Sequence, residues 1–140
     1  MLLKIKFAEA ADKNKAIGFF LKNVLKDNDA VISYEFLCPY WVSAAIDRGQ
    51  IIIITCRDEV IWWLRFYARK RDKVVSLYQF AIDKDFRSRW LVKKMLEFTW
   101  YASFEGACLK LSGFNDYYRK EGWENIKSDD KYNYWRYEMT

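Results

Sequence analysis

The sequence contains no histidine among its 140 residues. Zinc sites built from cysteine and histidine are therefore excluded, together with Ser-His-Asp and Cys-His catalytic groups, because each needs an imidazole. A general acid or base in this chain must be Asp, Glu, Lys, Tyr, Cys or a water molecule. We expect no metal cofactor.

Cysteine is also scarce, with three residues at Cys38, Cys56 and Cys108. They are odd in number and scattered, and each stands in an apolar setting. This pattern indicates reduced thiols of a cytosolic protein and not a disulfide framework. No apolar run is long enough to span a membrane, and the first seven residues carry charges within a short apolar run and lack the apolar core of a signal peptide. We expect a cytoplasmic protein with no membrane partner.

Aromatic and apolar residues are abundant, at 19% and 52% of the chain. A chain of this length and composition can bury a core without metals or disulfides, so a single domain over residues 1–140 is expected. Lys and Arg exceed Asp and Glu by 24 to 19, which gives a formal net charge of +5. That excess favours an anionic ligand or partner, or a solvated basic surface.

The hydrophobic pattern predicts an order of elements along the chain. The expected elements are a strand at 2–7, a helix capped by Asp12, a short helix at 41–48 closed by Gly49, a three-strand meander at 50–57, 60–70 and 74–83, a long helix from 91 stopped at 105–106, a strand at 107–111, a helix at 112–121 and a hairpin over 123–139. The aromatics Tyr34, Phe36, Tyr40 and Trp41 are expected in the core or in the wall of an acceptor pocket.

One strand of the meander has two different faces. Trp62, Leu64, Phe66 and Ala68 alternate with Trp63, Arg65, Tyr67 and Arg69. Next along the chain, residues 74–104 form a strand, a basic turn and a helix. A helix N-terminus in that position offers backbone N–H groups to an anion.

Two stretches, residues 81–96 around the basic turn and residues 117–123 of the later helix, resemble the GCN5-related N-acetyltransferase (GNAT) family. Residues 81–96, Ala-Ile-Asp-Lys-Asp-Phe-Arg-Ser-Arg-Trp-Leu-Val-Lys-Lys-Met-Leu, are similar to its strand-to-helix acyl-CoA motif. Residues 117–123, Tyr-Tyr-Arg-Lys-Glu-Gly-Trp, are similar to its late aromatic-tyrosine and glycine-aromatic segment. The element order agrees over essentially the whole chain. The resemblance implies an α/β (α+β) fold with a mixed, mostly antiparallel, twisted sheet of six to seven strands and four helices.

The resemblance also implies a function and a site. The expected reaction is acetyl transfer from acetyl-CoA, or from another acyl-CoA, to an amine of a small molecule or a protein. Tyr118 would be the general acid that reprotonates the departing thiolate. Glu35, Asp83 or water would deprotonate the amine. The cofactor-binding residues implied are Ala81, Ile82, Asp83, Arg87, Ser88, Arg89, Leu91 and Val92.

The turn of the first stretch departs from the family pattern of Gln or Arg, two residues, Gly, one residue, then Gly or Ala. Arg87 is in place, but Trp90 and Val92 occupy the two small positions and Ser88 stands where a further glycine is common. Glycine lets backbone N–H groups approach a pyrophosphate closely, and larger side chains would crowd that approach.

Two functions are therefore compatible with the sequence. In an active acyltransferase, Arg87, Ser88 and Arg89 would replace the missing glycine contacts by donating to phosphate directly. In an inactive relative, of a kind that would suit a phage gene, Trp90 would fill the cofactor cleft. A surface of Trp63, Arg65, Tyr67 and Arg69 would then bind a protein or nucleic acid. A homodimer through Tyr132, Tyr134, Trp135 and Tyr137 of the last strand is a further alternative.

Overall fold

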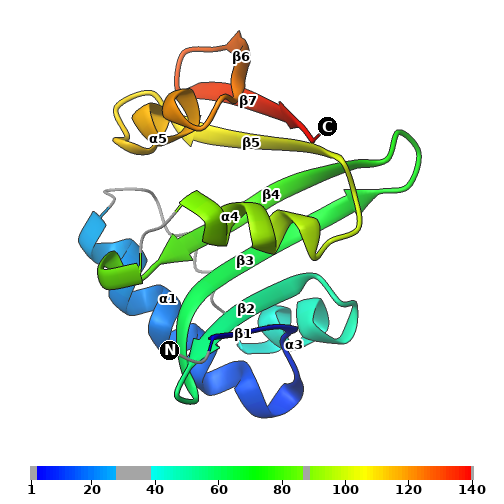
Figure 1. Ribbon diagram of the computed structural model, residues 1–140, viewed down its shortest axis with the longest axis vertical. Helices are drawn as coiled ribbons and strands as arrows, with labels where there is room; N and C mark the ends of the chain where they lie inside the picture. Colours follow the sequence, from blue (N-terminus) through cyan, green and yellow to red (C-terminus); the bar gives the residue numbers. More distant parts are fainter. Residues whose placement is uncertain (1–2, 28–38, 87–88, 140) are drawn as a thin grey trace.

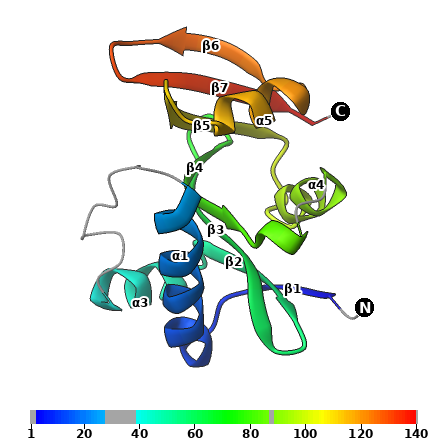
Figure 2. The same cartoon turned by 90° about the vertical axis from the view of Figure 1, so that its left-hand side faces the viewer.

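A twisted sheet of seven strands runs through the described part of the molecule, with helices on both of its faces (Figures 1 and 2). The structure, a computed structural model, describes residues 3–27, 39–86 and 89–139; side chains at 20, 23–27, 39, 78–80, 84, 89 and 90 are not described. The elements are β1 (Leu3–Phe7), α1 (Lys13–Asp27), α3 (Pro39–Asp47), β2 (Ile51–Cys56), β3 (Glu59–Arg69), β4 (Val74–Ile82), α4 (Arg89–Glu97), β5 (Ser103–Leu109), α5 (Phe114–Lys120), β6 (Glu124–Ser128) and β7 (Tyr132–Glu138). Short 3₁₀ turns lie at Ala10–Asp12 and Lys84–Phe86.

The strand order is β1-β2-β3-β4-β5-β7-β6. Only β4 and β5 pair in parallel, and all other neighbours in this sheet are antiparallel. The connection from β4 to β5 runs through α4, as a parallel pair requires. The predicted fold class is confirmed: the sheet is mixed and mostly antiparallel, with four α-helices in the described ranges.

Two core clusters lie on opposite faces of the sheet. The larger one, under α4 and α5, contains Ile52, Ile54, Trp62, Leu64 and Met95, while the smaller one, under α1 and α3, contains Ala16, Val42, Ile51, Ile53 and Trp63. The run of four isoleucines therefore alternates between two dry faces. A strand covered on both sides has no need of polar residues, which explains the unbroken apolar run.

The helix that begins near residue 91 is shorter than predicted, because it ends at Glu97. The Thr99 hydroxyl donates to the Leu96 carbonyl at 2.7 Å, and Trp100 adopts a left-handed conformation with φ of 67°. Both features stop the helix before the predicted terminus, and Phe98 then packs its ring against Phe7 at 5.1 Å. The predicted strand at 107–111 consequently starts earlier, at Ser103.

The sequence suggested that Gly106 ends the helix, but this glycine lies inside β5. Asp12 also differs from its predicted role as the residue that begins the helix. Its carboxylate accepts the Glu9 backbone N–H at 2.9 Å and pairs with Lys6 at 3.0 Å, so it closes the 3₁₀ turn that precedes α1.

The helix α3 starts at Pro39, a favourable first position because proline lacks an N–H to leave unpaired. Gly49 follows it with φ of 69°, as predicted for the end of this helix. Tyr40 and Trp41 are exposed, at 74% and 48%, so they do not form core, and their alternative place in the wall of an acceptor pocket stays a prediction. Tyr34 and Phe36 lie outside the described residues.

Candidate active site

Tyr118 sits on α5, whose inner face packs against β5 and β7. Its ring is buried at 6% exposure. It stacks on Trp135 at 5.7 Å between ring centroids and meets Trp123 edge-on at 4.9 Å. Aromatic neighbours on both sides leave the phenol ring little freedom to move.

The Tyr118 hydroxyl lies directly against the backbone of Gly106 in β5. A Cβ atom at position 106 would stand 3.0 Å from the hydroxyl oxygen, a contact tight enough that the tyrosine would have to shift. Burial, and to a smaller extent the neighbouring Cys108, raise the pKa of the Tyr118 phenol. The group therefore keeps its proton at neutral pH, so it can donate a hydrogen bond or a proton but cannot act as a base.

Gly106 marks the place where two parallel strands separate. The pairing between β4 and β5 covers four positions, from Val74 opposite Ser103 to Leu77 opposite Gly106. Beyond that point β4 continues to pair with β3, and β5 continues to pair with β7. The two strands diverge in Figure 1. Tyr118 thus places its hydroxyl at the apex of the divergence.

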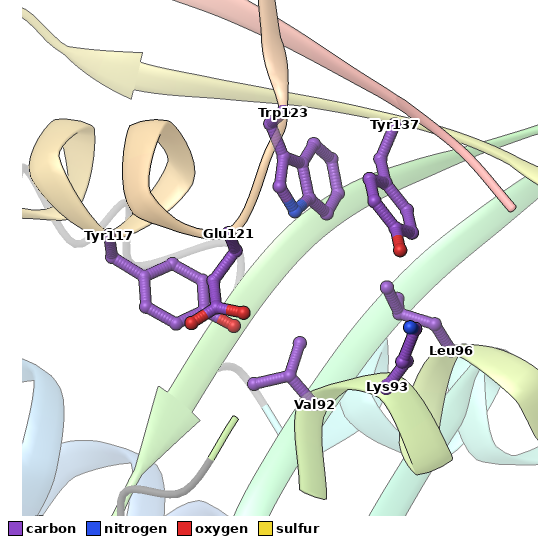
Figure 3. A pocket seen from close by; sticks show the side chains of 7 residues that line it. All are labelled: Val92, Lys93, Leu96, Tyr117, Glu121, Trp123 and Tyr137. Carbon is purple, nitrogen blue, oxygen red and sulfur yellow. The ribbon is translucent and has the colours of Figure 1, made fainter. Parts of the chain in front are cut away.

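A pocket of about 280 Å³ lies on the same face of the sheet, between α4 and α5 (Figure 3). Its wall consists of Val92, Lys93 and Leu96 from α4, Tyr117 from α5, Glu121 and Trp123 from the segment after α5, and Tyr137 from β7. Figure 3 shows Tyr117 and Glu121 directed toward Val92, with Trp123 and Tyr137 directed toward Leu96 and Lys93. The pocket is aromatic and apolar, with one cation and one carboxylate.

Tyr117 and Glu121 form the polar side of this pocket. They are one helical turn apart and therefore share a face. Burial, followed by the negative charge of Glu121, raises the pKa of the Tyr117 phenol. Both residues lie in the second stretch, 117–123, but the resemblance implied a role only for Tyr118. Their four-residue spacing is the signal that could have placed Tyr117 and Glu121 together.

The implied cofactor-binding residues divide into several groups. Val92 and Leu91 are buried on α4, and Val92 lines the pocket, so a side chain occupies space that a small residue would leave open. Ala81 and Ile82 are buried on opposite faces at the end of β4. Arg87 and Ser88 lie outside the described residues, as do the side chains of Arg89 and Trp90.

Asp83 accepts hydrogen bonds from the backbone of the turn that follows it. Its carboxylate accepts the backbone N–H of Asp85 at 2.9 Å, and its carbonyl accepts that of Phe86 at 2.9 Å. The Phe86 carbonyl in turn accepts the Trp62 indole N–H at 3.3 Å. These bonds hold the 3₁₀ turn between β4 and α4, and they engage one oxygen of the Asp83 carboxylate.

The expected partner surface on β3 is not continuous. Trp63 is fully buried under α1 and α3, so its inclusion in that surface is wrong. Arg69 pairs with Asp72 and Glu105, each at 3.1 Å. Arg65 is half-buried and Tyr67 is exposed. Trp135, expected in a dimer seam, is buried against Tyr118 and cannot face a second copy.

Within residues 3–27, 39–86 and 89–139, no group of three Asp, Glu or Cys side chains is arranged to hold a metal ion. No helix in these ranges is long and apolar enough to cross a membrane.

Comparison with known proteins gave matches to solved structures alone. No family model matches the sequence, and no curated protein matches it.

The structural matches cover nearly the whole chain. The PaiA N-acetyltransferase of Thermoplasma acidophilum, in complex with coenzyme A, matches with a TM-score of 0.79 at 10% identity over 99% of both chains. A GNAT-family acetyltransferase of Listeria monocytogenes matches with 0.75 at 11% identity, over 98% of this chain and 95% of the other. The N-acetylglutamate synthase of Neisseria gonorrhoeae, complexed with coenzyme A and N-acetyl-glutamate, matches with 0.73 at 6% identity, over 100% of this chain and 36% of the other.

At such low identity the agreement is one of backbone arrangement, and it extends from β1 to β7. The chain therefore has the fold of the GCN5-related N-acetyltransferases, as the two sequence stretches predicted.

Proposed function

We propose that this protein transfers an acyl group from an acyl-CoA thioester to an amine. The fold is shared with N-acetyltransferases, two of which were solved with coenzyme A. One observation within the chain carries the proposal: the protonated Tyr118 hydroxyl stands at Gly106, where β4 and β5 separate. A fold alone does not specify a function, but a proton donor held at this position could protonate a leaving thiolate, which supports acyl transfer in particular.

The pocket fits part of an acyl-CoA. Small-molecule pockets measure roughly 300–1,000 Å³, so a volume of about 280 Å³ suits the thioester arm and not the whole molecule. Val92, Leu96 and Trp123 supply apolar contact for the methylene carbons of that arm. Lys93 supplies a cation for a phosphate oxygen, and Arg87, Ser88 and Arg89 remain the proposed phosphate ligands.

The residues of the site would divide the chemistry as follows. The acceptor amine attacks the thioester carbonyl, so that a C–N bond forms and the C–S bond breaks. Tyr118 donates its proton to the departing sulfur and regains one from solvent. The amine loses a proton to water or to a carboxylate. The acceptor is a small-molecule or protein amine.

Binding is tested first, by thermal unfolding with and without acetyl-CoA. A ligand that binds only the native state at 100 times its Kd stabilises it by about 2.7 kcal/mol, which raises the Tm by several degrees. We expect such a rise with acetyl-CoA. An unchanged Tm at roughly a millimolar acetyl-CoA would reject the proposal.

Catalysis is tested by Tyr118→Phe. Removing a positioned general acid lowers turnover by roughly 10²–10⁴-fold, whereas the ring that shapes the site remains. We expect kcat to fall in that range while the acetyl-CoA-dependent rise in Tm persists. Tyr132→Phe is the matched control, because Tyr132 is an exposed tyrosine on β7, outside the pocket. Equal turnover of Tyr118→Phe and the control would remove Tyr118 from the mechanism.

An inactive binding module remains the alternative outcome of these experiments. It would show neither a rise in Tm nor turnover, and the candidate surface for a protein or nucleic-acid partner would then be reduced to Arg65 and Tyr67.

A further inference from the structure

Asn115, the second residue of α5, is a buried polar residue with several hydrogen bonds. Its exposure is 6%. The side-chain amide donates to three backbone carbonyls, and its oxygen accepts from two side chains. The partners are the carbonyls of Leu109 at 2.9 Å, Lys110 at 3.1 Å and Ser112 at 2.9 Å, the Asn133 amide at 3.1 Å and the Trp135 indole N–H at 3.0 Å.

These bonds connect three segments that are separate in the sequence. The carbonyls belong to the end of β5 and to the turn before α5, and the two donors belong to β7. The amide has two hydrogens for three carbonyls, so one hydrogen is shared. A buried network with both ends satisfied is rigid, since breaking any bond would leave a polar group without water. Asn115 therefore fixes the start of α5 relative to β7.

Trp135 connects this network to Tyr118. Its indole N–H is held by Asn115, and its ring stacks on the Tyr118 ring at an interplanar angle of 18°. Tyr118 also follows Asn115 by three residues on the same helix, so both lie on its inner face. Asn115 thus holds the helix that carries Tyr118 and the ring that covers it. Arg119 lies over the Trp135 ring as well, at 5.6 Å from its centroid.

We propose that Asn115 is a positioning residue for Tyr118, acting through the indole N–H of Trp135. The proposal rests on the proposed acyl transfer. Asn115 contacts none of the reacting atoms; it sets where the Tyr118 hydroxyl lies at the separation of β4 and β5. A displacement of about 1 Å in a catalytic group can cost roughly 100-fold in rate, so this support matters for turnover.

The test uses Trp135→Phe, which keeps an aromatic ring on Tyr118 and removes the N–H that Asn115 accepts. We expect kcat to fall between about tenfold and 100-fold, with the KM for acetyl-CoA unchanged within about twofold, because the wall of the pocket is intact. Asn125→Ala is the control. Asn125 is exposed and lies opposite Trp135 in the sheet, but its amide donates to the carbonyls of Lys127 and Tyr134 in the same hairpin and not to α5, so its removal leaves kcat unchanged.

A second readout does not depend on activity. The pH titration of the Tyr118 ring can be followed by NMR with ¹³C-labelled tyrosine in the full-length protein. In Trp135→Phe we expect the Tyr118 resonance to begin its alkaline shift at a lower pH than in the wild type while the protein is still folded, since a displaced phenol is better hydrated.

The outcomes separate this inference from the proposed function. An inactive wild type refutes acyl transfer, and the NMR titration then decides alone whether Trp135 positions Tyr118. An active wild type with equal kcat in Trp135→Phe overturns the positioning role. A loss of kcat together with a loss of folded protein, measured by circular dichroism, in both Trp135→Phe and Asn133→Ala shows a structural role only and also overturns it. Should Trp135→Phe fail to fold, Asn133→Ala replaces it, and kcat is again expected to fall; this variant removes the other side-chain donor to Asn115 and also the acceptor of the Ser128 hydroxyl.

Discussion

At the scale of single residues, the contact between Gly106 and Tyr118 has the clearest consequence. A glycine inside a strand normally weakens it, because it adds backbone entropy and packs no side chain. Here the missing Cβ makes room for a hydroxyl, since the nearest atom to a Cβ at 106 is the Tyr118 oxygen at 3.0 Å and the next is the ring carbon that bears it, at 3.6 Å. The glycine and the tyrosine are thus complementary.

Gly106→Ala should therefore displace Tyr118. Overpacking a buried site costs about 1–3 kcal/mol, and we expect a loss of that size in the free energy of unfolding measured in urea, together with reduced turnover. The double variant Gly106→Ala with Tyr118→Phe should recover most of the stability, because the ring carbon alone makes an ordinary contact.

Gly18→Ala on α1 is the matched control. No atom lies within 4 Å of a Cβ at that position, so alanine should stabilise the helix by roughly 0.5–1 kcal/mol. A double variant no more stable than Gly106→Ala alone would show that the oxygen contact is not the cause.

At the scale of elements, the two parts of the sheet are joined by little backbone pairing. Only four residue pairs connect β4 to β5. On the face opposite Tyr118, Glu105 adds a second connection: one carboxylate oxygen accepts from Arg69 of β3 at 3.1 Å and the other from Arg136 of β7 at 3.0 Å. Arg69 thereby reaches across β4, so the Glu105 carboxylate braces the strands on both sides of the divergence.

Glu105→Gln should weaken this brace. The three side chains are about a quarter to a third exposed, so two weakened ion pairs together should lower the free energy of unfolding by about 1 kcal/mol. The loss should shrink in 1 M NaCl, because salt screens partly exposed charges. Urea titrations at low and high salt measure both effects.

Asp116→Asn removes an exposed pair with Arg119 and serves as the comparison. It should cost less than about 0.5 kcal/mol. Equal costs for the two variants would mean that Glu105 is an ordinary surface charge.

At the scale of the whole molecule, buried phenols make the protein sensitive to alkali. The pKa values of Tyr117 and Tyr118 are raised above the ordinary 10.0, in both cases mainly by burial. Above pH 10 the unfolded chain releases these protons while the native state retains them. The unfolded state then binds fewer protons, so the free energy of unfolding falls as pH rises.

We therefore expect the free energy of unfolding, measured in urea, to be constant near pH 8 and to fall more steeply above pH 10. Burial also raises the pKa of Cys108 above its ordinary 9.0, so this thiol should begin the decline between pH 9 and pH 10. Tyr118→Phe should decline less steeply than the wild type between pH 10 and pH 11, because one of the proton-releasing groups is gone. Parallel declines in the two proteins would contradict the assignment of this effect to Tyr118.

Much of the architecture was predictable because hydrophobic periodicity is a local property. The order of elements, the two-faced strand β3 and the position of Tyr118 on a short helix all follow from spacings within about ten residues. The end of α4 did not follow, since it depends on the Thr99 hydroxyl and on a left-handed Trp100, a conformation that bulky residues seldom adopt.

The sequence by itself determined three things: its composition excluded imidazole chemistry, and the resemblance of residues 81–96 and 117–123 to the GNAT family implied the fold class and the candidate proton donor. Tertiary structure alone decided the rest. It buries Trp63 under α1 and α3. It also places Gly106, which was expected to end a helix, inside a strand and against the Tyr118 hydroxyl. Finally, it brings five hydrogen-bond partners to the Asn115 side chain. The burial of Trp63, the contact of Gly106 with Tyr118 and the two bonds from β7 to Asn115 join residues of different elements, and such contacts depend on how strands and helices pack, which no local pattern records.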